Sequence, residues 1–598
     1  MILSKGTLIS TALAGVLTLG GCSYGQMVKI AEEQDVQVNP SPLELHGDSV
    51  KFSISATLPL NMLKKNKLYS VKTKYGYGDQ EEEFDNLEFT LDEFENQDVE
   101  QPNISQEISF FYTDEMKQGA LTVQGIISNL EKTKFKETPT MELAQGVITT
   151  SQLVKDVTYT SYADHGYNNK EELVPTHVDF FFDKGQSKLK RSEVQGDEGK
   201  KLDAFIASKI ATKTVTITGS HSPEGPESKN SMLAEKRAEV ISKFYQDKMA
   251  QYDYKGLADS IKFDKKVIFQ DWSEFTTAVD SSANLTDSEK QEVKDIISSS
   301  TKSYEETEKE LQKLSFYSKL VKEVYVGLRF SKTEIWSIKP KKTDAEISIL
   351  AKGIVNGSLS KDTLSAEELL YAATLTPLKD EKEAIYEVAV RNNSSWQANN
   401  NLGAIYLDRG ILAITKTEAA EFYKKALVQF DLSLKKMQNA EALNNKAAIQ
   451  LLVGKKDDAL ATYKLATEAQ ASDSLVGEGI KAGLGTIYIK QGEYESAIAN
   501  LISAGKTAGV LYNLGLAQLL SKDFISAENS FENAVYTDKE LAKGYYCLAI
   551  VGARTENVDL IERLAEGVKL DADLREKALG DLEFSRYKEK EFFINAIK

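Results

Sequence analysis

The chain has few of the residues from which histidine- and cysteine-based sites are built. Its 598 residues include 4 histidines and 2 cysteines. The histidines are His46, His165, His177 and His221, and none has further ligands at the close spacing that a zinc site requires. No Ser-His-Asp order, phosphate-binding loop or dinucleotide-binding turn can be assembled around them. We therefore expect no enzyme activity, no metal and no cofactor.

Basic charge is also scarce. The chain has 73 Lys and Arg against 90 Asp and Glu, a formal net charge of -17, and no segment is dense in Lys and Arg. A protein that reads nucleic acid normally displays a basic patch that neutralises phosphates. We therefore expect no nucleic-acid partner.

The N-terminus begins with a short apolar run. In MILSKGTLISTALAGVLTLGGC, Lys5 precedes apolar residues that end in small ones, which is typical of a secretory signal peptide and too short for a stop-transfer helix. The final LGGC resembles a bacterial lipobox. In that family the cysteine is acylated and becomes the first mature residue, so the resemblance implies removal of residues 1–21 and a lipid anchor on Cys22. The alternative is a chance cysteine after an ordinary signal peptide.

Once Cys22 carries lipid, Cys547 is the one remaining thiol. An internal disulfide is then excluded, and the domains must be stable through core packing alone. Cys547 lies in the apolar stretch GYYCLAIVG, which predicts a buried small hydrophobe.

The length of 598 residues predicts several domains. Residues 22–165 contain strands such as SVKFSISATL, which alternates apolar and polar residues, with turn residues between them. They predict a β-sandwich, immunoglobulin-like in outline. Residues 166–340 mix strands and helices and predict an α+β domain, with a helix-rich insertion at 285–320.

Residues 341–598 predict an all-α domain with a recurring pattern of small and large residues. Successive copies contain Gly403, Tyr406, Gly410, Ala419, Tyr423 and Ala426; Ala447, Gly454, Ala459, Tyr463 and Ala466; Gly485, Tyr488, Gly492, Ala497, Leu501 and Ala504; and Gly515, Ala527, Phe531 and Ala534. The pattern resembles the tetratricopeptide repeat. The resemblance implies a superhelix of helix pairs, whose concave surface suits an extended peptide or a helix of a partner protein.

The middle domain contains GSHSPEGPESKNSMLAEKRA at 219–238, after the strand FFFDKGQSKL. From Gly219, a second glycine follows six residues on, Asn230 eleven on and Arg237 eighteen on. This spacing resembles the OmpA C-terminal peptidoglycan-binding domain over roughly 180–245, with a closing strand near 324–331.

The OmpA-like resemblance implies recognition of diaminopimelate in the peptidoglycan stem peptide. It assigns the ligand carboxylate to Arg237, whose planar fork donates two parallel hydrogen bonds, and carries the family asparagine over to Asn230. The family aspartate that binds the ligand ammonium is replaced by Ser222, and Glu224 on the same loop is the candidate substitute. The alternative is that Arg237 forms a structural salt bridge and the domain only docks.

The order of anchor, sandwich, OmpA-like domain and repeats resembles a group of Bacteroidota outer-membrane lipoproteins. Surface lipoproteins of that group tend to carry an acidic cluster directly after the lipidated cysteine, whereas the first acids of this mature chain are Glu32 and Glu33. The resemblance therefore implies the periplasmic face over the cell surface. Two functions follow. In the first, the protein tethers the outer membrane to peptidoglycan and its repeats recruit protein partners. In the alternative, it is an accessory subunit of an outer-membrane machine for barrel assembly, secretion or gliding, whose OmpA-like domain only docks.

Overall fold

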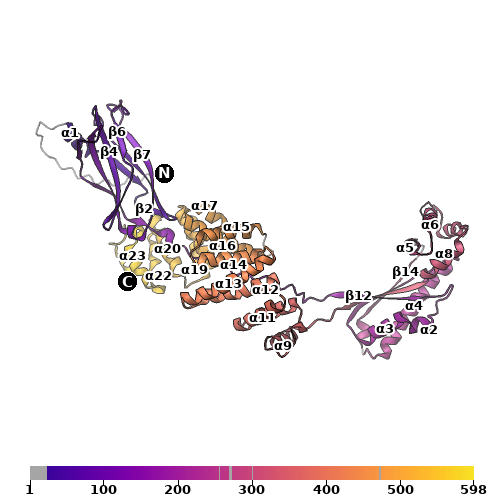
Figure 1. Cartoon of the computed structure of the whole chain (residues 1–598). Coiled ribbons are helices and arrows are strands. Elements are labelled where there is room, and N and C mark those ends of the chain that lie inside the picture. The colour runs from indigo at the N-terminus through magenta and orange to yellow at the C-terminus, as the bar shows by residue number, and fades with distance from the viewer. Residues whose placement is uncertain (1–22, 255, 269–271, 300, 470–472) are drawn as a thin grey trace. The chain divides into compact units, whose positions relative to one another are not determined.

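The computed structural model describes residues 23–598 apart from 255, 269–271, 300 and 470–472. The predicted signal peptide and Cys22 lie outside the described residues. The chain divides into two compact units (Figure 1). The first unit joins Met1–Gly166 to Leu350–Lys598, and the second is Tyr167–Ile349. In the part of the chain that the structure describes, no helix is long and apolar enough to cross a membrane.

The N-terminal part of the first unit is built of two sheets. One contains β1 (Asp35–Asn39), β2 (Leu43–His46), β3 (Ser49–Thr57), β7 (Asn103–Phe111) and β11 (Val147–Ile148). The other contains β4 (Lys67–Tyr77), β5 (Gln80–Glu83), β6 (Leu87–Thr90), β8 (Ala120–Asn129), β9 (Phe135–Glu137) and β10 (Met141–Gln145). The helix α1 (Ser23–Ala31) and the short η1 (Asp114–Gln118) and η2 (Thr150–Leu153) accompany them.

The core of this sandwich follows from the alternation seen in the sequence. Phe52 and Ile54 of β3 are buried and face the same cluster as Tyr69 and Val71 of β4, in the other sheet. Because successive strand residues point to opposite faces, the polar residues between them remain at the outer face. The predicted β-rich N-terminal region is confirmed.

The rest of the first unit is entirely helical. Its elements are α9 (Asp344–Val355, at the boundary of the two units), η5 (Lys361–Thr363), α10 (Ala366–Thr374), α11 (Lys379–Asn392), α12 (Trp396–Leu412), α13 (Lys416–Lys436), α14 (Ala440–Leu452), α15 (Lys456–Glu468), α16 (Ser474–Gln491), α17 (Tyr494–Leu501), α18 (Ala508–Leu520), α19 (Phe524–Thr537), α20 (Ala542–Thr555), α21 (Val558–Glu562), α22 (Leu564–Leu570), α23 (Asp573–Gly580), η6 (Leu582–Phe584) and α24 (Glu591–Ala596).

The helices pack as consecutive pairs, α12 with α13, α14 with α15, α16 with α17 and α18 with α19. The small residues of the repeat pattern lie where the two helices of a pair approach. A Cβ atom at Gly403 would lie 2.5 Å from the ring of Phe430, and one at Gly515 would lie 2.9 Å from the ring of Phe531. Residues 350–598, which we call the helical half, thus match the predicted tetratricopeptide arrangement. Cys547 of α20 is fully buried, as predicted, and burial raises the pKa of its thiol to about 12.

The second unit has one four-stranded sheet in the order β12-β15-β13-β14. Its elements are β12 (Leu173–Phe181), α2 (Arg191–Gln195), α3 (Asp197–Ala207), β13 (Thr212–Gly219), α4 (Glu227–Gln251), η3 (Leu257–Ser260), β14 (Lys262–Val267), α5 (Ser273–Ser281), α6 (Asp287–Ser299), α7 (Tyr304–Leu311), α8 (Tyr317–Glu323), η4 (Tyr325–Leu328) and β15 (Phe330–Ile338). The strands β13 and β14 pair in parallel, whereas β12 with β15 and β13 with β15 pair antiparallel.

Two cores hold the second unit together. Val215 of β13 and Phe180 of β12 pack against Ile241 and Tyr245 of α4, which covers the sheet. Helices α5–α8, inserted between β14 and β15, have a separate apolar core around Phe275. The insertion is therefore a small subdomain with its own packing.

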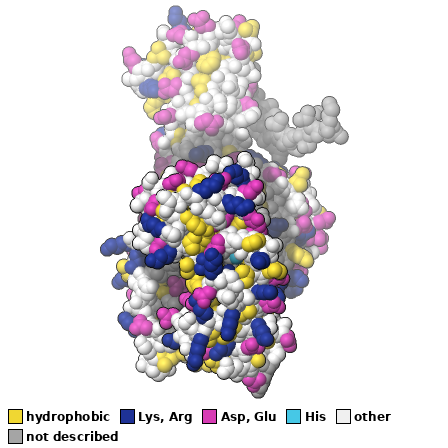
Figure 2. Space-filling model, turned by 90° about the vertical axis from the view of Figure 1, so that its right-hand side faces the viewer, with side chains coloured by type: hydrophobic (Ala, Val, Ile, Leu, Met, Phe, Trp, Pro, Cys, Tyr) yellow, Lys and Arg dark blue, Asp and Glu magenta, His cyan; other side chains and the backbone are white. Residues whose placement is uncertain are grey.

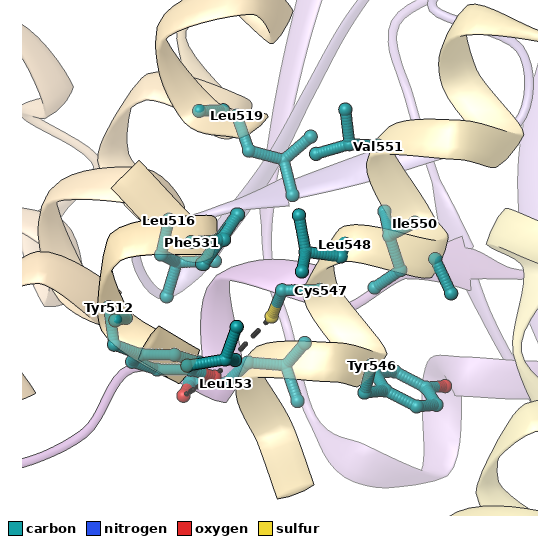
Figure 3. Packing of buried hydrophobic residues seen from close by; sticks show 14 of the residues in the cluster. Leu153, Tyr512, Leu516, Leu519, Phe531, Tyr546, Cys547, Leu548, Ile550 and Val551 are labelled. Carbon is teal, nitrogen blue, oxygen red and sulfur yellow. Dashed lines mark hydrogen bonds between the residues drawn. The ribbon is translucent and has the colours of Figure 1, made fainter. Parts of the chain in front are cut away.

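Residues 150–166 lead from the sandwich toward the second unit. The last sandwich strand ends at Ile148, and after η2 this described segment forms neither helix nor strand. It lies against the helices of the first unit, beginning with Leu153, which is buried in the cluster that also holds Tyr512 and Cys547 (Figure 3).

Candidate functional site

The predicted ligand edge of the second unit begins where β13 ends. Gly219 is the last residue of that strand, and a Cβ atom there would lie 2.0 Å from the carbonyl oxygen of Ala234 in α4. Only glycine fits so close to a helix backbone. Gly225 has a φ of +101°, a conformation that L side chains rarely adopt. The two glycines thus fold the loop between them back against α4.

Arg237 points from α4 beneath this loop and is 1% exposed. Its Nη1 donates to the Ser220 carbonyl oxygen at 2.7 Å, its Nε to that of Gln186 at 3.0 Å and its Nη2 to that of Asp183 at 3.2 Å. Among the described residues it forms no ion pair. The guanidinium therefore organises three main-chain carbonyl groups, and the structural salt bridge considered as the alternative is not what holds it.

The electrostatic surroundings of Arg237 are unfavourable for its charge. Burial, and then the positive charge of Arg329, lower the pKa of the Arg237 guanidinium to about 10. The group is still charged at neutral pH, because that value lies well above 7.

Glu224 and Ser222, the two residues considered for the ligand ammonium, are both engaged by Arg329. Glu224 Oε1 lies 2.5 Å from Arg329 Nη2, and Arg329 Nε donates to Ser222 Oγ at 3.1 Å. The Glu224 and Arg329 side chains are 8% and 9% exposed. A cation of the chain itself thus occupies the position beside Glu224 that the resemblance would give to the ligand.

Asn230 holds the loop in shape. Its Nδ2 lies 3.4 Å from the Ser222 carbonyl oxygen, 3.3 Å from that of Glu224 and 3.4 Å from that of Gly225. These contacts join the first turn of α4 to the loop. Asn230, Ser222, Glu224 and Arg237 therefore come together as the spacing predicts, but each has partners inside the protein.

The helical insertion covers the outer side of the loop. The N–H of Glu227 donates to Glu305 Oε1 of α7 at 2.7 Å, and the ring of His221 meets that of Tyr304 edge-on, 6.2 Å between centroids. His221 Nε2 lies 3.2 Å from Glu227 Oε1, and burial raises the pKa of the Glu227 carboxyl group. Covering by α7 explains why His221 is only 6% exposed.

Sequence reasoning missed Arg329 and the covering role of the insertion. Arg329 lies in GLRFS, directly between the end of the insertion and β15. An arginine at that junction was the available signal, but its partner Ser222 is 107 residues away. No spacing rule links residues so distant in the chain.

In chemical terms the site is a buried network of ion pairs and main-chain hydrogen bonds. Within the described residues, no group of three or more His, Cys, Asp or Glu side chains is placed to hold a metal ion. The network positions a loop, an arginine and an inserted subdomain against one another.

No protein-family model matches the chain, and no curated protein matches it. Similar solved structures include a tetratricopeptide repeat protein from Parabacteroides merdae, at 14% identity over 42% of this chain and 97% of that one, with a TM-score of 0.26. A repeat-containing protein from Cytophaga hutchinsonii is 15% identical over 39% of this chain and 91% of that one, with a TM-score of 0.26. A thermophilic repeat protein from Thermus thermophilus is 22% identical over 30% of this chain and 98% of that one, with a TM-score of 0.24. The tetratricopeptide character of the helical half rests on its own helix pairs and small residues.

Proposed function

We propose that this protein is a non-enzymatic scaffold of the outer membrane, facing the periplasm and anchored through a lipid on Cys22. In this proposal the second unit is an OmpA-like domain that docks onto protein neighbours and does not bind peptidoglycan. The observation that carries the proposal is the ion pair between Glu224 and Arg329 beneath the inserted helix α7. The protein would then serve as an accessory subunit of an outer-membrane machine.

A stem peptide would have to displace groups of the chain that already hold the loop. Its ammonium group would replace Arg329 beside Glu224, and its carboxylate would replace main-chain carbonyls around Arg237. Separating a buried ion pair typically costs about 3–5 kcal/mol, because one charge is left without a partner. That cost would have to be met before any contact with the ligand is gained.

The scaffold part of the proposal rests on the helical half. Stacked helix pairs present long continuous surfaces for other proteins. Large apolar side chains stand exposed on the second helices of two pairs, namely Val428 of α13 at 52%, and Ile525 and Tyr536 of α19 at 78% and 82%. The face shown in Figure 2 includes the second unit, and apolar side chains lie there in small groups between charged ones. Contiguous apolar patches are where protein partners gain contact area, and these exposed side chains are the positions in the helical half from which such a patch would be built.

The membrane anchor is tested by labelling cells with radioactive palmitate. The wild-type chain is expected to carry the label and to fractionate with the outer membrane. The Cys22→Ala variant is expected to lose both, because the acylated thiol is then absent. Label that persists in Cys22→Ala would show that the lipid is attached elsewhere and would contradict lipidation at Cys22.

The second candidate function is the peptidoglycan tether. It is favoured by one observation: Arg237 is a buried guanidinium that forms no ion pair among the described residues, and a ligand carboxylate would supply the missing negative charge. Sedimentation with isolated sacculi separates the two candidates. A tether requires the wild-type chain to pellet and Arg237→Ala to remain in the supernatant.

A further inference from the structure

Five asparagines of the helical half contact the segment that follows the sandwich. We call residues 153–163 the strap, and we call Asn400, Asn401, Asn444, Asn445 and Asn513 the asparagine ladder. All five asparagines are at most 2% exposed. Three of them, on α12, α14 and α18, each bind both main-chain groups of one strap residue.

The paired hydrogen bonds follow one pattern. Asn401 Oδ1 accepts from the N–H of Ala163 at 2.7 Å, and its Nδ2 donates to the Ala163 carbonyl at 3.0 Å. Asn445 binds Ser161 in the same way, at 2.7 Å for both bonds. Asn513 binds Lys155, at 3.0 Å from its N–H and 2.7 Å to its carbonyl. A carboxamide offers one acceptor and one donor side by side, which matches the N–H and C=O of an extended residue.

The two remaining asparagines each donate one further hydrogen bond to a carbonyl of the strap. Asn400 Nδ2 donates to the Ser161 carbonyl at 3.0 Å, and Asn444 Nδ2 donates to the Tyr159 carbonyl at 2.8 Å. The ladder thus satisfies main-chain groups of a segment that has no strand partner. Buried main-chain groups need such partners, since each one left unpaired costs stability.

The ladder recurs at one position of the repeat. Asn401, Asn445 and Asn513 each stand two residues before the small residue of their copy, Gly403, Ala447 and Gly515. The copy on α16 has Gly483 at the corresponding position instead. An asparagine in three of four copies is a sequence signal for a ligand that runs along successive repeats.

Side chains of the strap add apolar and ionic anchors. Leu153 and Val157 are 3% and 8% exposed and belong to the core cluster that runs from α16 to α24. Figure 3 shows Leu153 beside Tyr512, whose hydroxyl donates to the Leu153 carbonyl at 2.9 Å. The Asp156 carboxylate lies 2.5 Å from Lys490 Nζ. These side-chain anchors hold the first part of the strap, and the asparagines hold its middle and its end.

We infer that the asparagine ladder is a binding site for extended polypeptide main chain and that its ligand is the strap of this same chain. The ladder binds main-chain N–H and C=O groups, so it accepts many sequences. At two positions it accepts only small side chains, because Ser161 and Ala163 are 5% and 6% exposed. Because the strap of the same chain occupies the ladder, this face of the repeats is closed to partner peptides. It also joins the sandwich and the helices into one body, while partners contact the outward-facing helices.

Limited trypsin digestion of the full chain in detergent tests this inference at the bond after Lys155. Cleavage requires Lys155 to leave Asn513 and its neighbours to leave the helices they pack against, although the lysine side chain itself is exposed. We expect the wild-type bond to resist trypsin. Asn513→Ala removes both hydrogen bonds to Lys155, and we expect it to raise the cleavage rate at this bond about tenfold. The cleaved bond is identified by mass spectrometry.

Asn529→Ala is the matched control, because Asn529 is an exposed asparagine of α19 that bonds only to its own helix. In Asn529→Ala, trypsin should cleave the bond after Lys155 at the wild-type rate. Asn401→Ala, at the far end of the strap, is the second variant and should leave the Lys155 bond nearly as resistant as in the wild type. Rapid wild-type cleavage after Lys155, or equal rates in wild type and Asn513→Ala, would overturn the inference.

A labelled peptide of residues 152–164 provides a separate test. We expect it to bind the full chain in which residues 154–163 are replaced by a glycine-serine linker of equal length, and not to bind the wild type, whose ladder is filled. Failure to bind a linker variant with wild-type helical content would overturn the inference.

Discussion

Replacing Arg554 with alanine is expected to lower the free energy of unfolding of the first unit by about 3–5 kcal/mol. Arg554, on α20, bridges two carboxylates that come from distant parts of the chain. Its Nη1 lies 2.7 Å from Glu44 of the sandwich, and its Nε and Nη2 each donate to Glu583 of η6 at 2.7 Å. The Arg554 and Glu583 side chains are 17% and 2% exposed.

The large effect follows from what the substitution leaves behind. Without Arg554, the Glu583 carboxylate would be buried without a cationic partner. Burial alone would lower the pKa of Arg554, but the Glu583 and Glu44 carboxylates raise it above its usual value, so the arginine is charged at neutral pH. Two parallel hydrogen bonds to one carboxylate are also the strongest arrangement that an arginine makes.

Urea denaturation of the full chain, followed by circular dichroism, measures this loss. Arg586→Ala is the matched control, because Arg586 and its partner Glu556 are both 77% exposed and exposed pairs contribute about 0–1 kcal/mol. Arg554→Ala combined with Glu583→Gln should recover part of the loss, since the unpaired charge is then gone. Equal stability of Arg554→Ala and Arg586→Ala would show that this bridge does not stabilise the contact between the sandwich and the helices.

The second large effect is expected from Gly219→Ala. The new methyl group would lie 2.0 Å from the Ala234 carbonyl oxygen and 2.9 Å from its carbonyl carbon, so the whole end of β13 must move away from α4. Overpacking of this kind typically costs about 1–3 kcal/mol, and the upper end applies because the obstructing atoms are main chain. Arg237 would lose its Ser220 carbonyl partner in the same movement.

Differential scanning calorimetry of the full chain can follow the second unit separately if it melts as its own transition. Gly219→Ala should lower that transition by several degrees. Gly327→Ala is the control, because no atom lies within 4 Å of the Cβ position there and its φ is not positive. A transition that is the same in both variants would contradict the close approach of the β13 end to α4.

The parts of the fold that the sequence predicted are those with local causes. The alternation around Phe52 predicts a half-buried strand because side chains alternate between the two faces of a strand. The small residues at Gly403 and Gly515 predict close helix pairs because a neighbouring helix contributes a ring at each position. Cys547 was predicted to be buried from its apolar neighbours alone, and it is.

The parts that could not be predicted depend on contacts between distant residues. Glu224 was expected to face a ligand, but its carboxylate pairs with Arg329, which lies 105 positions further along the chain. The ladder asparagine Asn513 binds a main-chain group 358 positions earlier. The recurrence of asparagine in the repeats is visible in the sequence, but nothing local to the repeats shows that the ligand is the chain's own strap.

Sedimentation with isolated sacculi tests most directly whether the second unit docks with its ligand edge closed. The full chain in detergent is incubated with sacculi and pelleted, beside Arg237→Ala and Arg191→Ala, which removes an exposed basic side chain of the same unit. We predict that all three remain in the supernatant to the same extent. A wild-type chain that pellets together with Arg191→Ala, while Arg237→Ala stays in solution, would contradict the claim and establish the tether.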